Sequence, residues 1–77
     1  MNITDRLQNV MRDVFDQPGL VLRRDMTADD VPAWDSISHV SMLSAVENEF
    51  NIVIEMEDVK SLQNVGDLID LVARKAG

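Results

Sequence analysis

Three residues near the middle of the chain, Asp35, Ser36 and His39, are of the types that hydrolases use as acid, nucleophile and base. Their spacing argues against such a triad, because a serine and a histidine three residues apart on one helix do not aim at each other. The helical angle of His39 instead lies close to that of Met42 and Val46, toward the core. The chain also lacks a G-x-S-x-G motif. We therefore predict a packed or half-buried histidine and no hydrolytic site.

The segment DMTADDVPAWDS begins like a calcium-binding loop, with side-chain oxygens at its first, third and fifth positions. Such a loop needs glycine at the sixth position and a bidentate glutamate at the twelfth. Asp30 and Ser36 stand at these two positions. The sequence therefore predicts no metal site of this kind, and leaves open only weak binding of a divalent ion at the surface.

Ser36 also lies where a helical pattern begins. The N-terminus of a helix has unpaired N–H groups and a partial positive charge of about half a unit. A phosphate ester on the Ser36 hydroxyl would be well placed in this field. Alternatively, Ser36 is an ordinary residue of the first helical turn, and this physical argument favours neither interpretation.

The elements that must position Ser36 are three amphipathic helices and one short helix, predicted from apolar residues spaced three and four apart. Asn2, Asp35 and Asn64 are suitable N-cap residues for the three main helices. Pro18 and Gly19 end the first helix. The predicted helices cover residues 3–16, 36 to 49 or 50, about 57–61, and 64 onward, with a long connection over residues 18–35.

The second predicted helix has one buried side and one exposed side. At 100° per residue, Met42, Leu43, Val46 and Phe50 share the buried side. Ser36, Val40, Ser44 and Glu47 fall on another side. Ser36 is therefore expected to point away from the core.

Length and composition fit one small domain over residues 1–77. The hydrophobic content of 45% is enough for one modest, mostly aliphatic core. We therefore predict an all-α fold, a small antiparallel bundle of three main helices plus a short one, with a long loop between the first and second helices.

The net charge of −7 is concentrated in the middle of the chain, where acids outnumber bases by eleven to one over residues 25–70. Such a surface repels nucleic acid and anionic membranes and favours basic partners, although acidity can also serve solubility alone. The absence of cysteine excludes disulfides and thiolate metal sites. Without a signal peptide or a membrane-spanning run, we expect a cytoplasmic protein. We also expect it to be a monomer.

With Asp35, Ser36 and Ile37 forming DSI at the start of the helical segment SHVSMLSAVENEF, the sequence resembles the acyl carrier proteins. The resemblance extends to the chain length, the acidic balance, the helix–long loop–helix order and the later segment NVGDLIDLV. The tripeptide alone would be weak evidence for this family. Its position at the start of the second predicted helix, in a chain of this size, makes the resemblance specific.

The resemblance implies that Ser36 receives 4′-phosphopantetheine from coenzyme A, added by a separate phosphopantetheinyl transferase. Asp35 and Ile37 would complete the motif. The thiol of the arm would hold acyl groups as thioesters for the enzymes of fatty-acid, polyketide or related acyl-group biosynthesis. The chain itself would be a carrier and not an enzyme.

The resemblance also implies that acyl-loading and acyl-transfer enzymes dock basic patches on the second helix, here at Val40, Ser44 and Glu47. The sequence departs from fatty-acid carriers, because Ser41, Ser44 and Asn48 stand where these tend to be acidic or apolar. PAWDS likewise replaces the common Gly-Ala-Asp-Ser. These differences suggest a specialised freestanding carrier.

Two alternatives remain: an aminoacyl or peptidyl carrier of a nonribosomal-type pathway, and an unmodified acidic helical adaptor. Peptidyl carriers usually have Gly-Gly before the motif and are less acidic. The role of Trp34 is also open, because it could pack under the long loop or touch the arm and its partner enzymes.

Overall fold

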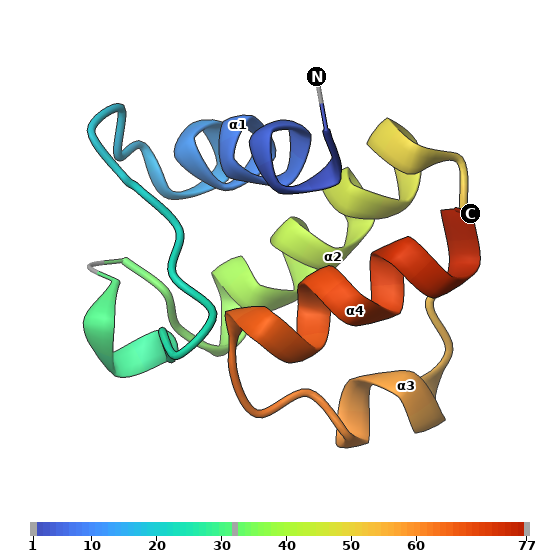
Figure 1. Cartoon of the computed structure of the whole chain (residues 1–77). Coiled ribbons are helices and arrows are strands. Elements are labelled where there is room, and N and C mark those ends of the chain that lie inside the picture. Colours follow the sequence, from blue (N-terminus) through green and yellow to red (C-terminus); the bar gives the residue numbers. More distant parts are fainter. Residues whose placement is uncertain (1, 32, 77) are drawn as a thin grey trace.

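The computed structural model describes residues 2–31 and 33–76, which form four α-helices and one 3₁₀ turn (Figure 1). This part of the chain contains no β-strand. The all-α prediction, with three main helices and a short one, is therefore confirmed. The elements are α1 (Ile3–Phe15), η1 (Ala28–Asp30), α2 (Ser36–Phe50), α3 (Met56–Lys60) and α4 (Val65–Ala76).

The ends of α1 are set by local hydrogen bonds. The side chain of Asn2 accepts a hydrogen bond of 2.8 Å from the backbone N–H of Asp5, as the sequence predicted. The helix ends at Asp16, which adopts a left-handed conformation with φ 53° and donates its N–H to the carbonyl of Arg12. The predicted end of this helix is thus correct to within one residue.

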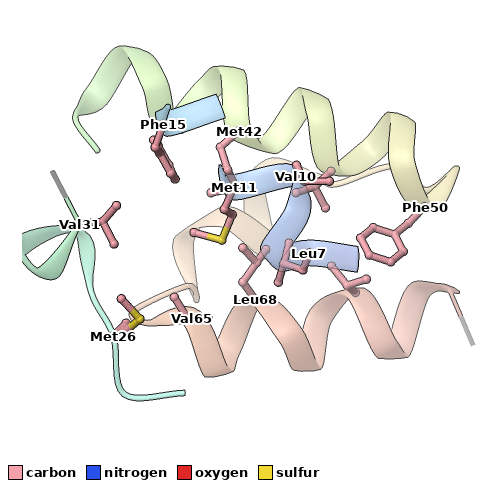
Figure 2. Packing of buried hydrophobic residues seen from close by; sticks show 12 residues of the cluster. Leu7, Val10, Met11, Phe15, Met26, Val31, Met42, Phe50, Val65 and Leu68 are labelled. Carbon is pink, nitrogen blue, oxygen red and sulfur yellow. The ribbon is translucent and has the colours of Figure 1, made fainter. Parts of the chain in front are cut away.

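The core lies between α1, α2 and α4 (Figure 2). It is aliphatic and rich in methionine, with Phe15 and Phe50 toward its two ends. Its twelve buried side chains are Leu7, Val10, Met11, Phe15, Met26, Val31, Met42, Val46, Phe50, Val65, Leu68 and Val72.

The long loop between α1 and α2 is fastened to the start of α4. The N–H groups of Val65 and Gly66 donate to the carbonyls of Met26 and Arg24, both at 2.8 Å. The Arg24 guanidinium then binds both carboxylate oxygens of Asp70, at 3.1 and 2.8 Å. A Cβ atom on Gly66 would lie 2.9 Å from the carbonyl oxygen of Arg24, so this close approach requires glycine.

The last two helices agree with their predictions within about one residue. The short helix α3 covers Met56–Lys60. Asn64 caps α4, because its side-chain oxygen accepts the N–H of Asp67 at 2.9 Å. Of the helices described, none combines the length and the apolar character needed to cross a bilayer.

Candidate functional site

Ser36 is the first residue of α2 and is exposed to solvent. The helix start is held by a capping box around it. The carboxylate of Asp35 accepts the N–H groups of Ile37 and Ser38 at 3.0 and 2.9 Å, and the Ser38 hydroxyl accepts the N–H of Asp35 at 2.8 Å. These bonds fix the backbone on both sides of Ser36 and leave its own side chain out of the box.

The same bonds reduce the number of N–H groups that an anion at this helix end could use. Two N–H groups of the first turn already donate to the carboxylate of Asp35. A phosphate ester on Ser36 would therefore gain from the charge of the helix end rather than from those two donors.

The turn that leads into α2 is strained at Ala33, which has a positive φ of 72°. A non-glycine residue in the left-handed region costs about 1–2 kcal/mol. The Ser38 hydroxyl lies 2.6 Å from the carbonyl oxygen of Ala33 and donates to it, which ties the turn to α2. The next residue, Trp34, is half-buried.

Trp34 packs between Phe15 of α1 and His39 of α2. Its ring centroid lies 5.2 Å from that of Phe15 and 6.0 Å from that of His39, with planes 29° and 17° apart. The indole Nε1–H donates to Nδ1 of His39 at 3.0 Å. His39 is half-buried, as predicted, and its Nδ1 is engaged by Trp34.

Both interpretations of Trp34 find support in the structure. The ring packs beneath the long loop, against Phe15 of the core. It also lines a shallow surface cavity together with Ala28, Asp35, Ser36 and His39. The Trp34–His39 hydrogen bond is one contact of this site that sequence reasoning missed, since no spacing rule pairs these two residue types.

The three docking candidates on α2 differ in their surroundings. Val40, which is 64% exposed, and the exposed Ser44 face solvent, as does Ile37, which is 81% exposed. Glu47 is half-buried, and its carboxylate accepts the backbone N–H of Ile54 at 2.8 Å. Glu47 therefore tethers the segment after α2, a contact that helical periodicity does not predict.

The capping box also acts on the charge of Asp35. The backbone N–H of Ser38 and then its hydroxyl stabilise the ionised carboxylate, so the pKa of Asp35 lies below its ordinary value. Asp35 therefore keeps its negative charge beside Ser36 at neutral pH.

Acid is expected to destabilise the fold through Asp35, Asp58 and Asp70. The pKa of Asp58 is lowered chiefly by the N–H of Glu55, and that of Asp70 by the hydrogen bonds from Arg24. Each of these carboxyl groups has a lower pKa in the folded chain than in the unfolded chain, where it is about 3.9. The resulting stabilisation of the fold is fully present above the unfolded pKa, and it is lost as the pH falls through the folded pKa. The urea midpoint should therefore drop progressively below about pH 4.

An Asp58→Asn variant provides the control for this pH dependence. The amide oxygen can still accept the N–H of Glu55, but the group no longer titrates. The drop in urea midpoint between pH 5 and pH 3 should be smaller in this variant, and a drop as steep as in the wild type would contradict the role of Asp58.

The chain is similar to several known proteins. Residues 5–72 match the family model described as "Phosphopantetheine attachment site". The chain is 33% identical over 79 residues to the acyl carrier protein of Thermosynechococcus vestitus, covering 97% of this chain and 96% of that protein. It is 25% identical over 77 residues to the acyl carrier protein of Solidesulfovibrio magneticus, covering 100% and 99%.

The fold is also similar to a solved structure. The solution NMR structure of holo acyl carrier protein from Geobacter metallireducens superposes with a TM-score of 0.90 at 40% identity, covering 97% of this chain and 86% of that one. The family match, these relatives and the four-helix fold agree with one another. The chain therefore belongs to the acyl carrier protein family, the phosphopantetheine-bearing carriers of acyl groups.

Proposed function

We propose that Ser36 is the attachment point of 4′-phosphopantetheine and that the protein shuttles acyl groups between the enzymes of fatty-acid, polyketide or related biosynthesis. The observation that carries this proposal is the exposure of the Ser36 side chain. Ser36 is the middle residue of DSI and the first residue of α2, and its side chain takes no part in the capping box. The arm supplies a thiol that forms thioesters, and the chain itself has no cysteine.

The attachment reaction balances without a further reactant. The Ser36 oxygen bonds to the phosphorus that bears the pantetheine of coenzyme A, the phosphoanhydride bond breaks, and adenosine 3′,5′-bisphosphate leaves as the hydroxyl proton is removed. A separate transferase performs this step. The residues of this chain present the hydroxyl, because the Asp35 and Ser38 bonds fix the helix start on both sides of it.

The test is intact-mass measurement after incubation with coenzyme A and a promiscuous phosphopantetheinyl transferase, followed by peptide mapping. A gain of one phosphopantetheine group on the peptide containing Ser36 is expected. If neither the freshly purified nor the incubated protein bears the group, the unmodified adaptor is the correct interpretation. An aminoacyl or peptidyl carrier would take the arm but would be loaded with an amino acid by an adenylating enzyme.

The partners we propose are the transferase and acyl-handling enzymes with basic docking patches. The exposed apolar residues Ile37 and Val40 lie on the same helix as Ser36, and Glu47 adds a negative charge further along it. This arrangement supports mixed apolar and electrostatic docking. We place the carrier in the cytoplasm, as a monomer between partner encounters.

Asp35 is expected to matter more for modification than for folding. Asp35→Ala removes the cap and should cost on the order of 1 kcal/mol. For a domain of this size that corresponds to a lower melting temperature by about 4–8 °C. The modification rate should fall more steeply, because the backbone around Ser36 loses its two fixing bonds and the motif loses its charge. Asp35→Asn keeps a cap acceptor and isolates the effect of charge.

Melting curves and timed mass spectra measure the two effects of Asp35→Ala separately. A variant that is modified at the wild-type rate while melting well below the wild type would show that Asp35 acts in folding alone.

Charge removal at Glu47 is expected to slow the transferase. Glu47→Gln suits this test because its amide oxygen can still accept the N–H of Ile54, which keeps the tether. The rate should fall roughly threefold to tenfold at low salt and less at high salt, since steering by surface charge is screened. Glu57→Gln on α3 is the control for general loss of charge. An unchanged rate at low salt would remove Glu47 from the docking surface.

A further inference from the structure

Two cavities meet at the Trp34–His39 pair. The first is the shallow cavity that contains Ser36. The second is partly enclosed, has a volume of about 110 Å³, and shares Ala28, Trp34 and His39 with the first. Its remaining lining comes from α2, α4 and the segment leading into α4, namely Met42, Leu62, Gln63, Asn64 and Leu68. The second cavity therefore borders the one that contains Ser36 at Trp34 and His39.

The pair is held in one orientation. The indole N–H of Trp34 donates to Nδ1 of His39, and the Trp34 ring is stacked on Phe15 of the core. Because Nδ1 accepts this hydrogen bond, the neutral imidazole carries its proton on Nε2. His39 thus presents an N–H donor on a ring that lines both cavities.

Asn64 gives the second cavity another donor. Its side-chain oxygen is committed to the N–H of Asp67, the cap of α4, so its amide NH₂ is left to donate. Met42, Leu62 and Leu68 form an apolar wall beside these polar groups. An apolar cavity with a few placed donors suits a small molecule that has a hydrocarbon part and an oxygen acceptor.

The volume of the cavity sets the size of a group that fits inside it without moving the surrounding side chains. A cavity of about 150 Å³ holds one benzene molecule, so about 110 Å³ holds roughly four or five heavy atoms. To lie wholly inside the cavity, an acyl chain of eight carbons would have to separate the packed side chains of Met42 and Leu68, which are buried.

We propose that the Trp34–His39 pair makes this protein selective for short acyl groups, of about four carbons, that carry a hydroxyl or keto oxygen beyond the thioester. This inference rests on the proposed attachment at Ser36. The oxygen accepts hydrogen bonds from His39 Nε2–H and the Asn64 amide, while the carbon chain lies against the apolar wall.

The test loads the chain with butyryl, 3-hydroxybutyryl or octanoyl phosphopantetheine from the matching acyl-coenzyme A, and verifies each by intact mass. Hydrolysis of each thioester is then compared with that of the same acyl group on free pantetheine. The 3-hydroxybutyryl thioester should be protected roughly twofold to tenfold more than the butyryl one, the range of one net hydrogen bond. The octanoyl thioester should be protected less than the 3-hydroxybutyryl one, and equal or stronger protection of octanoyl would overturn the selectivity for short groups. The indole N–H signal of Trp34, the only tryptophan, should shift with it in ¹⁵N-edited spectra.

Two variants decide whether the pair causes the selectivity. His39→Phe keeps a flat ring but removes the donor, and Asn64→Asp keeps the cap acceptor of α4 but removes the amide donor. Either should reduce the difference between 3-hydroxybutyryl and butyryl protection. Equal protection of these two thioesters in the loaded wild type would overturn the inference, and so would unchanged selectivity in both variants. If none of the three acyl-phosphopantetheine groups can be loaded, the attachment proposal on which this inference rests would be overturned instead.

Discussion

Ser36→Ala is expected to abolish phosphopantetheinylation completely while leaving the fold intact. The substitution removes the attacking oxygen, so no amount of transferase or time should restore a mass gain. Stability should change by no more than about 0.5 kcal/mol, because the side chain is exposed and stands outside the capping box. Intact mass after prolonged incubation and a urea unfolding curve measure the two effects.

Neighbouring serines on α2 provide matched controls. Ser44→Ala removes another exposed hydroxyl from the same helix and should be modified like the wild type. Ser38→Ala removes the hydroxyl that donates to Ala33 and accepts from Asp35, so it should lower stability by about 1 kcal/mol yet still receive the arm. A mass gain in Ser36→Ala would assign the arm to a different residue.

The helices were predictable because their signals are local. Apolar spacing and N-cap residues placed α1, α2 and α4 close to their observed bounds, and Asn2, Asp35 and Asn64 each cap the helix that follows. The exposure of Ser36 followed from its angle on α2. A helix start and an exposed side depend on residues within a few positions, which a sequence shows directly.

The contacts that shape the site were not predictable, because they join residues far apart in the chain. Arg24 and Asp70 are 46 positions apart, and their contact helps fasten the long loop to α4. Glu47 was placed on an exposed side by periodicity, whereas its carboxylate turns to the N–H of Ile54. Such contacts depend on how the loops fold back over the helices, and no local pattern encodes that path.

Trp34 connects one such distant contact to the candidate site, because it has a neighbour in each region. One neighbour, Phe15, belongs to the core, and the other, His39, lines the cavity beside Ser36. The aromatic stack therefore connects core packing to the surface from which the arm would extend. A substitution of Phe15 in the core should therefore change the position of the Trp34 ring at the candidate site.

Phe15→Ala is accordingly expected to cause the largest loss of stability among these substitutions. Phe15 is 2% exposed and loses both its core contacts and its stack on Trp34. Truncating a buried phenylalanine costs about 3–5 kcal/mol. A chain of this length has a total stability of roughly 4–12 kcal/mol, so the variant should retain little resistance to urea. Circular dichroism during urea titration measures the loss.

A milder pair of variants separates stability from the effect on the site. Phe15→Leu and Phe50→Leu each remove one ring from the core, but Phe50 packs under the Arg6 guanidinium, 4.5 Å away, and does not stack on Trp34. Both should lower the urea midpoint, whereas Phe15→Leu alone should shift the native emission of Trp34. If Phe50→Leu shifts that emission equally, the stack is not what holds Trp34 in place. The core and the candidate site would then be coupled by a broader rearrangement of the bundle.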